Sequence, residues 1–143
     1  MKPNSTHAPK WIQDLTKGDL HSLISDTTGD DEAAVSRSVE FFIHESFGLW
    51  HNRARSKLCR GFKNRPPSLR YCQLMVDTIC TRLLSGQFYE QFWEQLSMAI
   101  RFDRERMAEA AAVALQSDRE YIRRYARRIL HAIDSIPDSE NAG

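Results

Sequence analysis

Apolar residues recur at intervals of three and four positions along almost the whole chain, and no stretch alternates for long enough to form a strand. This spacing gathers apolar side chains on one face of an α-helix. The pattern stops at Pro66-Pro67, because proline lacks an amide donor and restricts the residue before it. It stops again at Ser85-Gly86, a typical helix end. The chain is therefore predicted to be all-α.

The breaks divide the chain into about six predicted helices. One or two short helices are expected within 10–27, then a helix from 30 to about 45 with a second helical segment to about 62, and further helices at approximately 67–84, 87–101, 103–116 and 119–134. The chain is expected to bend near Gly48, between the two segments of 30–62, and the first of these begins with Asp30, Asp31 and Glu32. Negative charge is favoured at a helix start because the backbone dipole is positive there.

The length of 143 residues fits one domain with a core of its own. Short connections imply antiparallel neighbours, so we expect an irregular stack of αα-hairpins over residues 10–136, between polar tails at 1–9 and 137–143. No apolar run approaches the roughly 18–20 residues that span a bilayer, and the start has no hydrophobic signal core. We therefore expect a cytoplasmic protein with no membrane partner.

The helical spacing also assigns residues to the core. In the segment before Pro66-Pro67 the predicted core stripe is Trp50, Ala54, Leu58 and Phe62. In the next helix the inward residues are expected to be Leu69, Cys72, Val76, Ile79, Cys80 and Leu83. The three cysteines, Cys59, Cys72 and Cys80, show no C-x-x-C spacing, which predicts buried, reduced thiols.

Motifs for catalysis are absent. The sequence has no nucleophile elbow, Walker loop, dinucleotide fingerprint, H-E-x-x-H or zinc-ribbon spacing. Glu40 and His44 lie one turn apart on a predicted helix, which is only a fragment of a metal site. Cys59 stands beside Arg60 but has no evident base. We predict a protein that is not an enzyme and needs no cofactor, metal or small-molecule substrate.

Charge is distributed unevenly although the net charge is only +1. The window 46–76 contains no acidic residue and seven basic ones, whereas residues 1–45 carry four basic and eight acidic groups. Such asymmetry can create a binding patch that the total conceals. The basic residues of the window are Arg53, Arg55, Lys57, Arg60, Lys63, Arg65 and Arg70.

Three of these cations are expected to form one stripe. At about 100° per residue, Arg53, Lys57 and Arg60 lie beside the predicted core stripe, and Arg55 lies on the opposite flank. Like charges at this spacing repel unless something negative faces them. The candidates are phosphate, an acidic partner, or the acidic helix within residues 30–45; solvent is the simplest alternative. Lys63, Arg65 and Arg70 would extend the stripe.

The predicted helix 87–101 is the most aromatic element. Its apolar face is wider than one packed neighbour needs, and most of it is expected to be core. The remainder, around Phe88 and Trp93, is a candidate groove for a partner or a second copy.

The last two predicted helices carry the most specific pattern, in ALQSDREYIRRYARRILHAI. Ser117 and Glu120 have capping-box spacing, with Glu120 also placed to pair with Arg124. Arg124 and Arg128 are expected to face solvent.

This segment resembles the second half of a HEAT repeat. The matching residues are Leu115, Asp118, Ile122, Arg123, Ala126, Leu130 and Ile133. The resemblance implies a hairpin over 103–134 in which Asp118 caps the second helix and Arg123 bonds an acidic residue of a neighbouring repeat. It also implies scaffolding or binding. Helices 67–84 and 87–101 do not repeat the pattern, so a long regular solenoid is excluded.

Two functions follow from these patterns. The first is a protein-interaction or adaptor domain, with an acidic partner on the basic stripe or an apolar partner on the aromatic helix. The alternative is nucleic-acid binding through the basic residues of 53–70, although no recognised signature for it is present. The sequence names neither the partner nor the oligomeric state.

Overall fold

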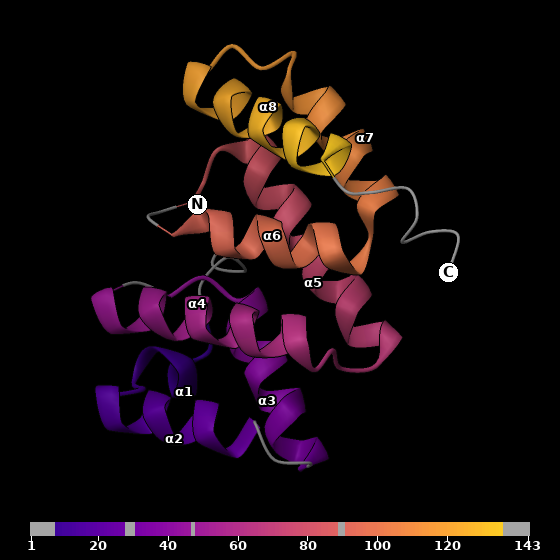
Figure 1. Cartoon of the computed structure of the whole chain (residues 1–143). Coiled ribbons are helices and arrows are strands. Elements are labelled where there is room, and N and C mark those ends of the chain that lie inside the picture. Colours follow the sequence, from indigo (N-terminus) through magenta and orange to yellow (C-terminus); the bar gives the residue numbers. More distant parts are fainter. Residues whose placement is uncertain (1–7, 28–30, 47, 89–90, 136–143) are drawn as a thin grey trace.

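The computed structural model describes residues 8–27, 31–46, 48–88 and 91–135, and within these ranges it contains eight helices and no strand (Figure 1). The helices are α1 Lys10–Gln13, α2 Lys17–Thr27, α3 Glu32–Ile43, α4 Leu49–Asn64, α5 Leu69–Ser85, α6 Phe92–Phe102, α7 Arg104–Ala114 and α8 Glu120–Asp134. The prediction of one all-α domain is confirmed.

The described residues form eight helices rather than about six. Residues 10–27 form α1 and α2, and the expected bend at Gly48 is a full break between α3 and α4. Gly48 has a φ of 121°, a backbone conformation that residues other than glycine rarely adopt.

Local signals set several of the helix ends. The Asp31 side chain accepts a hydrogen bond from the Ala33 amide at 3.0 Å and caps α3. Gly86 ends α5 in the left-handed conformation, with a φ of 77°. The α6 helix begins at Phe92, later than predicted, so Phe88 precedes it. Of the predicted tails, residues 1–7 and 137–143 lie outside the described residues. Ala8 is buried.

The helices lie in two layers, one containing α2, α4, α6 and α8 and the other α3, α5 and α7 (Figure 1). Two neighbours of the first layer, α4 and α6, meet at a constant separation along the chain. Arg60 bonds Glu94 and Lys63 bonds Ser97, and each pair is 34 positions apart. Because the later residue of α4 meets the later residue of α6, the two helices run parallel.

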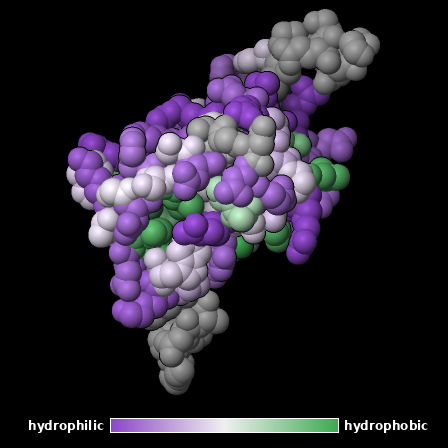
Figure 2. All heavy atoms as spheres, turned by 90° about the horizontal axis from the view of Figure 1, so that it is seen from below, coloured by the Kyte–Doolittle hydropathy of each residue, from purple (hydrophilic) through white to green (hydrophobic). Residues whose placement is uncertain are grey.

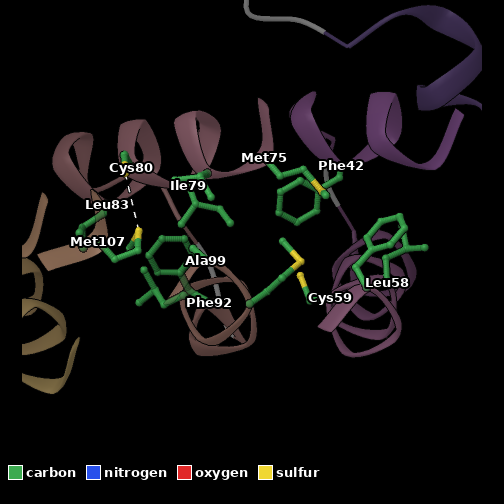
Figure 3. Close-up of a cluster of buried hydrophobic side chains, with 14 of the residues drawn as sticks. Phe42, Leu58, Cys59, Met75, Ile79, Cys80, Leu83, Phe92, Ala99 and Met107 are labelled. Atoms are coloured by element: carbon green, nitrogen blue, oxygen red, sulfur yellow. Dashed lines mark hydrogen bonds between the residues drawn. The ribbon is translucent and has the colours of Figure 1, made fainter. Parts of the chain in front are cut away.

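The core lies between the two layers (Figure 3). Ala54, Leu58 and Phe62 of α4 are buried as predicted. All three cysteines are buried and free. Their burial confirms the predicted thiols.

Two predicted core residues are exposed. Trp50 retains 41% of its surface and Leu69 retains 72%. Both lie on the first turn of their helices, α4 and α5. Periodicity identifies the correct face of a helix, but it does not say whether a neighbouring helix reaches far enough to cover the end.

The predicted capping box is not formed. Arg119 is the N-cap residue of α8, and Ser117 Oγ accepts a hydrogen bond from the Arg119 amide at 3.1 Å. Glu120 bonds Arg123 and Arg127, both at 2.8 Å, and these two replace the expected Arg124. The carboxylate that pairs with Arg123 is that of Glu120, which belongs to α8 itself rather than to a neighbouring helical pair.

Candidate interaction surface on helix α4

The face of α4 that points away from the core carries the three cations of the predicted stripe. Arg53, Lys57 and Arg60 are all exposed, while Ala54, Leu58 and Phe62 on the other side are buried. The exposed side chains Leu49 and Trp50 precede the cations on the first turn of the helix. The surface therefore combines apolar and positive groups.

Trp50 is the centre of a cationic cluster. Lys17 Nζ lies 4.3 Å from the centroid of its ring, and the Arg53 guanidinium carbon lies 5.2 Å from it. An ammonium or guanidinium over an indole face is attracted by the electron-rich π-system. These contacts keep the ring at the surface, so Trp50 belongs to the outer face of α4 rather than to the core.

The C-terminal half of the stripe is engaged by α6. Arg60 Nη1 lies 3.3 Å from Glu94 Oε2, and Lys63 Nζ donates to Ser97 Oγ at 2.8 Å. The expected internal counter-charge from 30–45 is wrong for this stripe, because Glu45 pairs instead with Arg82 at 2.9 Å. Glu94 was missed because nothing in the sequence indicates that 60 and 94 are neighbours.

The other predicted basic residues are spread over different parts of the molecule. Within the described residues Lys57 makes no ion pair or hydrogen bond. Arg65 lies at the end of α4, and exposed Arg70 lies on the first turn of α5, in the other layer. The basic run is thus not one continuous surface.

The aromatic residues Phe88 and Trp93 lie against α8. The Phe88 ring stacks on Phe92 at 4.2 Å between centroids and meets Tyr125 edge-on at 5.1 Å. Trp93 carries the Arg128 guanidinium 3.9 Å above its ring, so Arg128 is not simply solvated as expected. Much of the predicted groove is therefore filled by α8 itself.

A buried polar cluster, which was not predicted from the sequence, surrounds the end of α3. Arg82, only 5% exposed, donates to Glu45, to Gln95 and to the Phe42 carbonyl oxygen, at 2.9, 3.0 and 2.7 Å. Arginine near a helix C-terminus compensates both the free carbonyl groups and the dipole.

Arg55 is the second member of this cluster. It is also 5% exposed, and it donates to the Ser46 carbonyl oxygen at 2.8 Å and to the Ser46 hydroxyl. Its guanidinium lies 5.1 Å from the ring centroid of Phe41. On the helical wheel of α4, Arg55 lies between the buried residues Leu58 and Cys59. This position is the signal in the sequence from which the burial of Arg55 could have been predicted.

His51 is buried beside the cluster. Its Nδ1 lies 2.7 Å from Ser46 Oγ and its Nε2 lies 3.1 Å from the Leu15 carbonyl oxygen. Because a carbonyl oxygen can only accept, the proton is on Nε2 and Nδ1 accepts from the serine hydroxyl. Burial lowers the pKa of His51, and the nearby Arg55 charge acts in the same direction.

The cluster is satisfied internally. Among the described residues no buried side-chain nitrogen or oxygen lacks a hydrogen-bond partner. A cavity of about 20 Å³ next to Arg55 and Arg82 has room for about one water molecule. These features indicate a structural role for the two buried arginines.

A larger cavity, of about 160 Å³, opens between α2 and α4. Apolar parts of Ile24, Leu58 and Phe62 line it, and Lys57 and Arg65 contribute to its wall. Gly61 lies in the same wall, and a Cβ atom built there would meet nothing within 4 Å. From below, this end of the molecule is mostly hydrophilic with small hydrophobic patches (Figure 2).

The side chains that the sequence offered for chemistry are poorly suited to it. Burial raises the pKa of the Cys59 thiol to about 12, which leaves almost no thiolate near neutral pH. In the described part of the chain no three His, Cys, Asp or Glu residues gather as a metal site would require. Glu40 and His44 accordingly lack a third ligand there.

Comparison with known proteins adds no relative. No protein-family model, no curated protein and no solved structure matches the chain. Over the described ranges, no helix combines the length and the apolar character needed to cross a bilayer.

Proposed function

We propose that this chain is a protein-interaction domain that binds an acidic segment of a partner through the outer face of α4. The observation that carries the proposal is the exposed Trp50 ring between Lys17 and Arg53. Tryptophan and arginine are the residues most enriched among those that dominate binding energy at protein interfaces. Leu49, 54% exposed, adds apolar surface beside them.

Charge selects the kind of partner. Arg53 and Lys57 make no ion pair with any residue that the structure describes. Two neighbouring cations of the same helix raise the local potential, and carboxylates of a partner would lower it. An acidic segment is therefore the complementary ligand for this face.

Protein is favoured over nucleic acid because the cations do not track a backbone. Arg60 and Lys63 are held by α6, and Arg70 stands in the other layer. A groove for single-stranded nucleic acid combines a continuous positive path with aromatic rings that are free to stack. Trp50 instead already has cations against its ring.

We also propose that the fold is an irregular stack of αα-hairpins, with α7 and α8 as a HEAT-like hairpin. Its support is the similar separation of contacts between successive helices of the first layer, 33 positions for Lys17 with Trp50 and 34 for Lys63 with Ser97, and the packing of α7 on α8. Stacked helical pairs typically present an extended surface to proteins.

Selection from a random twelve-residue peptide library displayed on phage tests the binding proposal. We expect the enriched peptides to be rich in Asp and Glu, and to lose binding to the variant Arg53→Glu/Lys57→Glu. The matched control is Arg70→Glu/Arg124→Glu, which changes the net charge equally at exposed positions elsewhere. Enrichment of peptides without acidic residues, or no enrichment at all, would overturn the proposal.

A titration with a labelled twenty-nucleotide single strand completes the test. We expect weak binding that falls steeply with salt and that both double variants weaken alike, as for non-specific attraction. Tight binding of the oligonucleotide that only Arg53→Glu/Lys57→Glu abolishes would replace the proposed function with the nucleic-acid alternative.

A further inference from the structure

The cavity between α2 and α4 lies on the same side of α4 as the exposed tryptophan. Trp50, Lys57 and Gly61 fall within a narrow arc of the helix, at intervals of seven and four residues. Lys17 at the start of α2 meets Trp50 at the start of α4, and Ile24 near the end of α2 shares the cavity with Gly61. The cavity is therefore a continuation of the cationic face along the α2–α4 seam.

Gly61 has no conformational reason to be glycine. It lies inside α4, and its φ is not among the positive values that the structure contains. A Cβ at this position would meet open space, so no close neighbour requires its absence. Glycine inside a helix is unfavourable relative to alanine because it loses more backbone entropy on folding. What the missing side chain does provide is access to the cavity.

The size of the cavity fits one aromatic or large aliphatic side chain. Its volume of about 160 Å³ is close to the roughly 150 Å³ of an engineered protein cavity that binds benzene. Leu58 and Phe62, 2% and 3% exposed, form an apolar wall, and Lys57 gives the opening a positive charge.

We propose that this cavity receives a phenylalanine side chain from the acidic partner segment, whose carboxylates then meet Lys57 and Arg53. The proposal rests on the proposed function and adds to it a specific anchor. An acidic segment with one central phenylalanine is the occupant that matches both the apolar wall and the charge at the opening.

Two synthetic peptides test the anchor. Both are twelve residues long and composed of Asp, Glu and Ser, and they differ only in a central Phe or Ser. Fluorescence anisotropy should show that the Phe peptide binds the unchanged protein about tenfold or more tighter than the Ser peptide, as expected for burial of one ring.

The variant Gly61→Leu should remove this advantage by filling the cavity, while the affinity for the Ser peptide remains unchanged. Gly18→Leu in α2 is the matched control, because a Cβ there meets only Thr16 Oγ1 at 3.9 Å and Gly18 does not line the cavity. Gly61→Ala should raise the urea midpoint of unfolding, which shows separately that the position tolerates a side chain.

The outcomes separate the two proposals. If the Phe peptide binds no tighter than the Ser peptide, or if Gly61→Leu keeps the difference, the anchor is wrong and the acidic surface stands. If neither peptide binds, the proposed function fails with it. Sedimentation velocity covers a different occupant: an unchanged protein that dimerises and a Gly61→Leu variant that does not would assign the cavity to a second copy of the chain and overturn the proposal.

Discussion

The Arg82 guanidinium donates a hydrogen bond of 2.7 Å to the carbonyl oxygen of Phe42, joining α5 to the end of α3 from a position that is 5% exposed. The same group lies 5.0 Å from the Phe42 ring centroid. The last carbonyl groups of a helix have no amide donor within that helix. The Arg82 side chain supplies such a donor and thereby holds the C-terminus of α3 against α5.

Replacing Arg82 by methionine should destabilise the fold by about 3 kcal/mol. The substitution keeps most of the side-chain volume but leaves Glu45 and the Phe42 carbonyl without their donor. Glu45 is 32% exposed in its side chain and can reach water, which limits the loss. Urea unfolding measures the change, with Arg70→Met on the same helix as an exposed control. Equal urea midpoints for Arg82→Met and Arg70→Met would contradict this role of Arg82.

His51 should make the stability dependent on pH in the mildly acidic range. Burial lowers its pKa below the usual 6.5, so the unfolded chain takes up a proton that the native protein resists. The free energy of unfolding is therefore highest above pH 6.5, falls as the pH decreases, and levels off only below the lowered pKa. Urea midpoints for the unchanged protein and for His51→Gln measure the effect. The variant should lack this slope, and parallel profiles would contradict it.

Gly86 should not tolerate a side chain. Its φ is 77°, and a Cβ atom would contact Tyr121 Oη and lie 2.9 Å from Ile122 Cδ1. Gly86→Ala should cost about 1–2 kcal/mol from the left-handed conformation alone, with the contacts adding to this. Gly61→Ala should have the opposite sign in the same urea experiment, up to about 1 kcal/mol. Two changes of the same sign would contradict the assigned environments.

Trp50 and Phe62, twelve positions apart on one predicted stripe, should differ strongly in their contribution to stability. Phe62 is 3% exposed, so Phe62→Ala should cost about 3–5 kcal/mol. Trp50 is 41% exposed, and Trp50→Ala should cost less than about 1 kcal/mol, mostly from its contacts with Lys17 and Arg53. Urea midpoints compare them, and a large loss for Trp50→Ala would return this residue to the core.

The fold class and most of the core could be predicted from the sequence because both depend on local periodicity. Leu58 and Cys72 are buried where the helical spacing places them, and Gly86 ends its helix where a glycine was expected. The Asp31 side chain caps α3 by accepting a hydrogen bond from the amide of Ala33, two residues later. Each of these features is indicated by residues within a few positions of one another along the chain.

The partners of the charged residues could not be predicted in the same way. Arg60 and Glu94 are 34 positions apart, with the whole of α5 and two connections between them, and no local pattern indicates that the two side chains lie side by side. Arg82 and Phe42 are 40 positions apart. Long-range pairs of this kind depend on how helices pack, so the sequence offered the acidic helix within 30–45 as one candidate and did not indicate Glu94 of α6.

The sequence by itself therefore determined that the chain is helical, where most helices end, and which face of most helices carries the core residues. Only the tertiary structure decided that Arg55 and Arg82 are buried, that Trp50 remains at the surface, and that a cavity opens beside Gly61. The physical reason is that periodicity is a property of one helix. Exposure, ion pairing and cavities are properties of the space between helices, and the packing of all eight described helices defines that space.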